Sequence, residues 1–214
     1  MDRNRFRALV ARCGVDSAPP VDGDALFDEL ERHYREPGRR YHTGEHIVHC
    51  LGMLDTVLHA LDDPDAVELA LWYHDAVYDL RAGDCENERR SAELFETRLG
   101  AAVGPERARR IRDLVMVTTH RREPRTRDEA FIVDIDLSSF GLPWDEFLRD
   151  SIAVREEFGH LGDDEFFPRQ RQFLGRLLAR GVFCYTDEFR QRHEERARAN
   201  IERYLERITS VGAD

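Results

Sequence analysis

Apolar residues recur at spacings of three and four along almost the whole chain, and no alternating run of apolar and polar residues is flanked by hairpin turns. This pattern predicts an all-α protein. Thr43 has the properties of a helix N-cap, and Pro64 suits the first turn of the next helix. The expected helices cover residues 3–13, 22–34, a segment from Thr43 that ends before Pro64, a segment that starts near Pro64, and 86–99, 105–119, 128–139, 144–158, 164–180 and 187–208.

Glycine and proline separate these helices, notably at Gly100, at Gly104-Pro105 and from Gly141 to Pro143. No Gly/Ser-rich linker and no shift in composition divides the 214 residues, so the sequence predicts a single all-α domain, a helical bundle. Within it we distinguish N-terminal helices at 1–40, a central part at 41–140 and C-terminal helices at 141–214.

The chain is acidic and carries no membrane signal. Its 32 basic and 43 acidic residues give a formal net charge of -11, which argues against nucleic acid or an anionic membrane as the main partner. No uncharged apolar window reaches the roughly 18 residues that a membrane-spanning helix needs. The four cysteines are scattered without a CxxC pair, which is typical of a reducing compartment, and we expect a cytoplasmic protein.

The stretch LWYHDAVYD at 71–79 places a histidine and an aspartate side by side in an apolar run. No charged residue lies between Glu68 and Asp75, so most of this helix is expected to be buried. A buried carboxylate is costly unless it is paired or coordinates a metal. The adjacent His74 and Asp75 therefore predict that a further partner lies close to them.

Two other helices each carry a candidate partner. His46 lies on the apolar face of its helix together with Cys50, and the segment FIVDIDLSSF at 131–140 interrupts a second apolar run with two acids. Residues two apart on a helix are rotated by about 200°, so these two acids do not face the same point. Asp136 shares an apolar stripe with Ile132 and is the preferred inward acid, but Asp134 also aligns with apolar residues and stays an alternative.

One metal ion explains all of these buried groups together. We predict that it is coordinated by His46, His74, Asp75 and Asp136. Two imidazoles and two carboxylates suit Mn, Fe, Co, Ni or Zn better than Ca, which prefers oxygen ligands alone. The sequence therefore predicts a divalent transition metal as the cofactor.

Four motifs surround the predicted ligands: YHTGEHI at 41–47, WYHDAVYD at 72–79, NERRSA at 87–92 and DIDLSSFG at 134–141. They resemble the HD superfamily of metal-dependent phosphohydrolases, and more narrowly a bacterial branch of predicted HD-domain hydrolases. The similarity covers most of the chain from Tyr41 onward. The resemblance implies an HD-type helical bundle with a buried site for one or two ions, and hydrolysis of a small phosphate ester such as a nucleotide.

A bound divalent ion polarises a phosphoryl oxygen and lowers the pKa of bound water from about 15.7 to about 7. Such hydrolysis also needs a nearby group that handles protons, and Glu45, Asp79 and Glu88 are the candidates. The family members that hold a second ion use additional histidines. His42, His49 and His120 are available here, and His120 is the candidate that we single out. His42 is a candidate for substrate binding or for ligation.

A phosphate ester also needs positive charge from the protein. Arg39-Arg40 precede the helix of His46, and Arg155, Arg171 and Arg198 lie in the C-terminal segments that resemble the family. Guanidinium groups form paired hydrogen bonds with phosphate oxygens. We therefore predict that Arg155, Arg171 and Arg198 bind a small phosphorylated substrate, with no nucleic-acid polymer and no membrane as partner. The sequence indicates no particular oligomeric state.

Three alternative functions are compatible with parts of this pattern. Residues 42–46, HTGEH, match the H-x-x-E-H pattern of inverted zinc peptidases, in which Glu45 would be the general base. That pattern needs both histidines on one continuous helix, whereas Gly44 and the Thr43 cap place His42 before the helix. The resemblance also admits a di-iron oxygenase or a noncatalytic nucleotide-binding module, since fold does not fix function.

Overall fold

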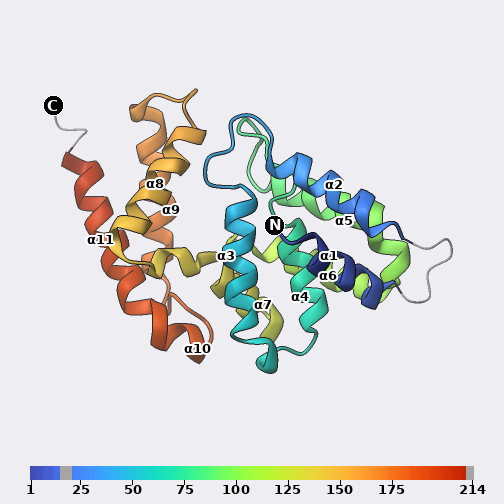
Figure 1. Ribbon diagram of the computed structural model, residues 1–214. Coiled ribbons are helices and arrows are strands. Elements are labelled where there is room, and N and C mark those ends of the chain that lie inside the picture. Colours follow the sequence, from blue (N-terminus) through green and yellow to red (C-terminus); the bar gives the residue numbers. More distant parts are fainter. Residues whose placement is uncertain (15–20, 211–214) are drawn as a thin grey trace. The chain divides into compact units, whose positions relative to one another are not determined.

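The computed structural model describes residues 1–14 and 21–210, and the regular secondary structure in these ranges is entirely helical (Figure 1). The predicted all-α class is therefore confirmed. The chain forms two compact units, Met1–Val133 and Asp134–Asp214, and each is described by itself. The single domain expected from the sequence stays a prediction. In the described ranges no helix is both long enough and apolar enough to cross a lipid bilayer.

The helices of unit 1 are α1 (Arg3–Cys13), α2 (Gly23–Tyr34), α3 (Gly44–Asp55), the short 3-10 helix η1 (Leu58–Ala60), α4 (Pro64–Tyr73), α5 (Glu86–Val103), α6 (Pro105–Val117) and α7 (Arg127–Asp136), whose last residues begin unit 2. Local signals explain where several of them start. The side chains of Asp2, Asp22 and Thr43 accept hydrogen bonds from first-turn amides of α1, α2 and α3. The predicted Thr43 cap is confirmed.

α4 is the central helix of unit 1, in contact with α1, α3, α5 and α6 (Figure 1). Every residue from Ala66 to Tyr73 is buried, which explains the long apolar run in the sequence. Glu68 is the one charged residue in this buried stretch, and its carboxylate accepts a 2.7 Å hydrogen bond from Arg5 Nε of α1. Because α4 is enclosed in this way, its C-terminal end delivers the next residue, His74, to the protein interior, where it is 1% exposed.

The ends of α5 and α7 differ most from the sequence-based expectation. The expected break at Gly100 is wrong, because α5 continues to Val103. The chain turns instead at Gly104, which adopts a φ of 82°, a conformation that favours glycine, and Pro105 then opens α6. α7 also ends at Asp136, three residues earlier than expected, and continues as the 3-10 helix η2 (Leu137–Gly141).

Unit 2 contains η2, α8 (Trp144–Glu157), α9 (Asp163–Ala179), α10 (Asp187–Phe189), the π-helical turn η3 (Arg190–Glu194) and α11 (Glu195–Ser210). α11 packs on η2, η3, α8 and α9. Aromatic rings fill this core, with Phe147 meeting Tyr204 at a centroid distance of 5.9 Å and Phe140 meeting Phe183 at 6.0 Å. The single helix expected over 187–208 is interrupted in the structure, because the π-helical turn η3 separates α10 from α11.

Candidate metal site

His74 and Asp75 lie at the C-terminal end of α4 rather than inside a helix. α4 ends at Tyr73, and the amide of His74 still donates to the carbonyl oxygen of Ala70 at 2.8 Å. Neighbouring residues within a helix point about 100° apart. Because the helix ends here, the two side chains can converge, and His74 Nε2 lies 3.1 Å from Asp75 Oδ2.

His46 of α3 brings a third polar group to the same point. Its Nε2 lies 3.2 Å from His74 Nε2 and 3.6 Å from Asp75 Oδ2. The three side chains are 2%, 1% and 13% exposed. Two ligand atoms that bind one ion at about 2.1 Å lie roughly 3.0 to 3.4 Å apart in octahedral or tetrahedral geometry. The observed separations are therefore close to those of ligands around a single cation.

The hydrogen bonding of His74 leaves a position for a cation. Its Nδ1 lies 2.9 Å from the carbonyl oxygen of Leu71, which can only accept, so Nδ1 carries a proton. In the neutral imidazole, Nε2 then presents a lone pair to Asp75 Oδ2, which is also an acceptor. A proton or a metal ion between these two atoms removes the repulsion. Metal-binding histidines usually donate from the far nitrogen in this way, so the contact with Leu71 also orients His74 for ligation.

The neighbouring imidazoles favour the ionised form of Asp75. Burial by itself raises the pKa of this carboxyl group, but the positive charge that His74, His42 and His46 carry when protonated, with the hydrogen bond that His74 then donates, outweighs burial and lowers the pKa of Asp75 below its ordinary range. An ionised carboxylate beside imidazole nitrogens is a donor set typical of transition-metal sites. The residues of unit 1 could therefore hold a divalent transition metal.

Cys50 is a further donor that the sequence placed beside His46 but did not identify as a ligand. Its Sγ lies 3.7 Å from His46 Nε2, and donor atoms of His46, Cys50 and His74 all lie within 4.8 Å of one another. All three residues are buried. The four-residue spacing of His46 and Cys50, which puts both side chains on one face of α3, was the signal that could have identified this thiol.

The two acids at the end of α7 belong to unit 2, and contacts within that unit separate their roles. The Asp134 carboxylate accepts hydrogen bonds from the amides of Tyr185 and Thr186 at 2.8 and 2.7 Å, and from the Thr186 hydroxyl at 2.7 Å. Burial raises the pKa of Asp134 to about 6, although these bonds oppose the shift. Asp134 thus secures the chain before α10, and Asp136 stays the predicted metal ligand.

The remaining histidine candidates have different surroundings. The His42 ring stacks on Tyr78 at a centroid distance of 4.1 Å and lies 6.1 Å from the His46 ring, so His42 is next to the candidate site. His120 follows α6 with a φ of 55°, a left-handed conformation that is uncommon for residues other than glycine. Its role as a ligand of a second ion stays a prediction.

The start of α3 argues against the zinc peptidase alternative. α3 begins at Gly44, and the Thr43 hydroxyl accepts a hydrogen bond from the backbone amide of Glu45 at 3.2 Å. His42 therefore precedes the helix, whereas the H-x-x-E-H mechanism needs two histidines one turn apart on the same helix.

The three predicted proton carriers lie on different segments of unit 1. Glu45 is exposed in the first turn of α3, directly before His46. Asp79 is exposed in the chain after α4, where its carboxylate accepts a hydrogen bond from the backbone amide of Arg81 at 2.9 Å. Glu88 is half-buried in the first turn of α5. Their catalytic roles stay predictions.

Two of the three predicted phosphate-binding arginines are already bonded within unit 2. Arg155 donates to two carbonyl oxygens around the α8–α9 loop, at 2.9 and 3.0 Å, and pairs with Asp163 at 2.7 Å. Arg198 donates to two carbonyl oxygens at the end of α9, at 3.1 and 3.2 Å. Arg171 is half-buried, and its guanidinium forms no hydrogen bond or ion pair with the residues that the structure describes. Arg171 is therefore the best placed of the three to bind a ligand.

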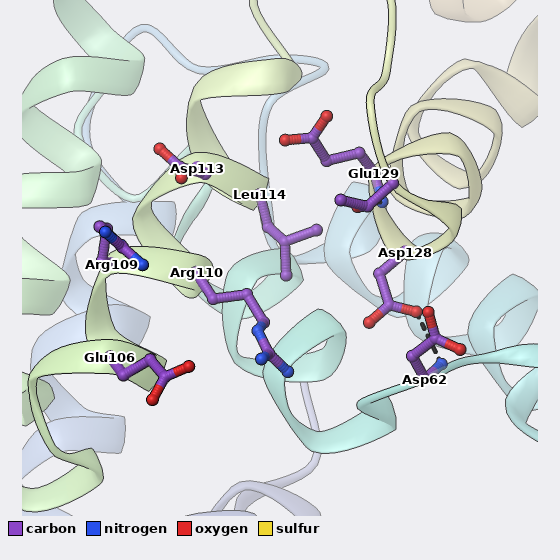
Figure 2. Close-up of a pocket in the computed structure, with 9 residues that line it drawn as sticks. Asp62, Glu106, Arg109, Arg110, Asp113, Leu114, Asp128 and Glu129 are labelled. Carbon is purple, nitrogen blue, oxygen red and sulfur yellow. Dashed lines mark hydrogen bonds between the residues drawn. The ribbon is translucent and has the colours of Figure 1, made fainter.

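Figure 2 shows a different hollow of unit 1, about 400 Å³ in volume, at α6 and the start of α7. It is lined by five acidic residues and two arginines, and none of the candidate metal ligands lines it. Asp128 accepts the amides of Asp62 and Asp63 at 2.8 and 3.0 Å, and Arg122 binds both carboxylate oxygens of Glu129. The buried acids of this hollow therefore hold segments of the fold together.

Comparison of the chain with protein families, with curated proteins and with solved structures finds no match. The metal site is therefore inferred from the residues and contacts of this chain alone.

Proposed function

We propose that the protein is a metal-dependent phosphohydrolase of the HD type, with a divalent transition metal held by His46, His74, Asp75 and Asp136. The observation that carries the proposal is the convergence of His46 Nε2, His74 Nε2 and Asp75 Oδ2 within 3.1 to 3.6 Å of one another. The apolar core of unit 1 gives no reason to bury these groups together. The resemblance of the surrounding motifs to HD hydrolases adds the reaction class.

A bound ion would supply a Lewis acid for a phosphoryl oxygen and a means to deprotonate water near neutral pH. The protein residues orient and protect this chemistry. The carbonyl oxygen of Leu71 fixes the tautomer of His74, and the ionised Asp75 adds negative charge that favours a cation. Asp136 is proposed as the fourth ligand because it shares the apolar stripe of its helix.

The proposed substrate is a small phosphate ester. Arg171 is the proposed phosphate-binding residue of unit 2, because Arg155 and Arg198 are bonded to backbone carbonyls. In unit 1, a hollow of about 580 Å³ at the start of α3 is lined by residues that include Arg35, Arg40 and Glu45. Glu45, Asp79 and Glu88 are the proposed proton carriers, and His42 is proposed to contact substrate.

The chemistry of the ligand atoms also limits which metal ions suit the proposed site. Imidazoles and carboxylates suit Mn, Fe, Co, Ni and Zn, whereas a thiolate from Cys50 would favour Zn or Co over Mn. One ion needs only the four proposed ligands, and a second would call on His120.

The metal content per chain tests the proposal directly. Purified wild-type protein, His74→Ala and His59→Ala are compared by elemental mass spectrometry. His59 is a matched control because it is exposed on η1. We expect about one or two transition-metal ions per chain in the wild type and in His59→Ala, and none in His74→Ala. A metal-free wild type, even after reloading with Mn, Fe, Co, Ni and Zn, would contradict the site.

The reaction class needs a second test on the metal-loaded protein. We expect turnover of a chromogenic phosphate monoester or diester that is lost in His74→Ala and kept in His59→Ala. Metal without phosphate release would contradict the hydrolase. In that event, oxygen consumption by the iron-loaded protein would indicate an oxygenase, and nucleotide binding without turnover would indicate a binding module.

A further inference from the structure

Arg39 connects the two segments of unit 1 that carry the candidate ligands. It lies between α2 and α3, and its side chain is only 2% exposed. Arg39 Nη1 donates to the carbonyl oxygens of His42 and Asp75 at 3.0 and 2.7 Å. Nη2 donates to the carbonyl oxygen of Ala76 at 2.8 Å and to the Glu36 carboxylate at 3.2 Å. One guanidinium group thus bonds the chain before His46 and the chain around Asp75.

The chemistry of the α4 terminus explains why a cation is placed here. The last carbonyl oxygens of a helix lack partners within the helix, and positive charge is favourable near them. Arg39 bonds the two carbonyl oxygens just beyond the end of α4, and the Tyr34 hydroxyl donates to the carbonyl oxygen of Trp72 at 2.9 Å. The α2–α3 segment therefore binds the end of α4 at several points.

Aromatic rings restrict the guanidinium further. Its carbon lies 5.3 Å from the centre of the Tyr34 ring and 5.4 Å from that of Tyr78, both within the range of cation–π contact. Tyr78 also stacks on His42. The same group of side chains therefore holds Arg39 and the approach to the candidate site.

We propose that Arg39 is a positioning residue that sets the spacing between His46 and the His74–Asp75 pair. This inference rests on the proposed metal site, and it replaces the sequence-based view of Arg39 as part of a phosphate-binding cluster. The planar guanidinium reaches carbonyl oxygens on two segments at once. A lysine ammonium is a single point of charge and does not reproduce that geometry.

Binding of Co²⁺, followed by the visible absorption of the bound ion, tests this role without any substrate. The variants are Arg39→Lys, Arg39→Met and the control Arg5→Lys. Arg5 also bonds a buried partner of α4, the carboxylate of Glu68, and it pairs with Asp55 at the far end of α3, but it bonds neither the residues just before His46 nor those around Asp75. Urea unfolding of each variant establishes the concentration range in which it is folded, and Co²⁺ titrations are made within that range.

We expect Arg39→Lys to bind Co²⁺ about 10 to 100 times more weakly than the wild type, which is the usual cost of losing an outer contact to a metal site. Its absorption spectrum should also change, because the ligand spacing changes. Arg5→Lys should keep both the affinity and the spectrum of the wild type. Arg39→Met takes the place of Arg39→Lys if the lysine variant does not fold, and the same loss is expected.

Two results would overturn the inference. In one, the Arg39 variants bind Co²⁺ as the wild type does, with the same spectrum. In the other, Arg5→Lys loses affinity to the same extent, which would reduce the effect to general destabilisation. A wild type that binds none of Co²⁺, Zn²⁺, Mn²⁺, Fe²⁺ and Ni²⁺ would instead overturn the proposed function itself, so the two failures are distinguishable.

Discussion

An aspartate carboxylate lies at each end of α4, and the two are stabilised in opposite ways. At the N-terminal end, Asp128 accepts two backbone amides, those of Asp62 and Asp63. At the C-terminal end, Asp75 lies beside the side chains of His46 and His74, whose ring nitrogens are the proposed metal ligands. Two backbone amides donate to the first carboxylate, whereas the second lies against imidazole nitrogens, of which His74 Nε2 carries a proton only when that ring is protonated.

The pKa shifts of these two acids reflect the same difference. Burial raises the pKa of Asp128, and its two amide hydrogen bonds only partly oppose the shift. The pKa of Asp75 is lowered in spite of burial, because imidazoles surround it. Asp128, which accepts two backbone amides, stabilises the fold, whereas Asp75, which lies among imidazoles, has surroundings that favour a bound cation. This comparison distinguishes the hollow of Figure 2 from the candidate metal site.

The largest expected effect separates the two aspartates by metal content. Asp75→Asn should lose the bound ion and, with it, hydrolysis of phosphate esters, because a neutral amide is a poor metal ligand beside the two histidines. Asp128→Asn should keep the ion. Elemental analysis and a phosphate-release assay measure both. Metal retained at wild-type level in Asp75→Asn would contradict the proposed role of the Asp75 carboxylate as a ligand.

Chelation should lower the stability of the wild type, because the ion binds the folded protein only. At a free metal concentration of 100 times Kd, the free energy of unfolding should be about 2.7 kcal/mol higher than in the chelated protein. Asp128→Asn should show the same increment and Asp75→Asn none. Urea unfolding with and without chelator gives these values, and an equal increment in Asp75→Asn would place the ion elsewhere.

Asp128→Asn should destabilise unit 1 by about 1 to 3 kcal/mol, with the metal left in place. The asparagine keeps one acceptor oxygen and turns an amide donor toward a backbone N–H, so one buried donor loses its partner. Urea unfolding of the metal-free proteins measures the difference. An unchanged free energy of unfolding in Asp128→Asn would mean that water, and not this carboxylate, satisfies the two amides.

The smallest expected effect is a change with pH in the difference in free energy of unfolding between the wild type and Asp128→Asn. The pKa of Asp128 is raised in the folded protein, so the folded state holds this proton more tightly than the unfolded state. Its contribution to stability is therefore full below the ordinary carboxyl range, near pH 3.9, and is lost as pH rises through the raised value. The free-energy difference between wild type and Asp128→Asn should shrink over this interval. A difference that grows with pH would show that the amide bonds outweigh burial.

Much of the fold could be predicted because its signals are local. The Thr43 cap and the proline that opens α4 are each read from a few neighbouring residues, and both predicted helix starts are confirmed. Gly100 was misleading because a glycine is also tolerated inside a helix. A Cβ built at Gly100 would lie 3.9 Å from Ala108 Cβ of α6, which is an ordinary contact distance. The sequence does not distinguish such a tolerated glycine from a break.

The candidate site could be predicted only in part. The apolar run around His74 and Asp75 indicated that both are buried, but it did not indicate that α4 ends at Tyr73, which lets the two side chains converge. The role of Arg39 depends on carbonyl oxygens 36 and 37 residues away in the chain. No local pattern identifies partners at that separation, and an arginine beside another arginine resembles a phosphate site instead.

The contact that closes the N-terminal end of α4 also has a consequence during synthesis. Asp128 is separated from Asp62 by 66 residues, a span that includes all of α4, α5 and α6. At translation rates of about 5 to 20 residues per second, roughly 3 to 13 seconds pass before the ribosome makes that partner. Until then, the amides of Asp62 and Asp63, which precede α4, lack the acceptor that they have in the folded protein.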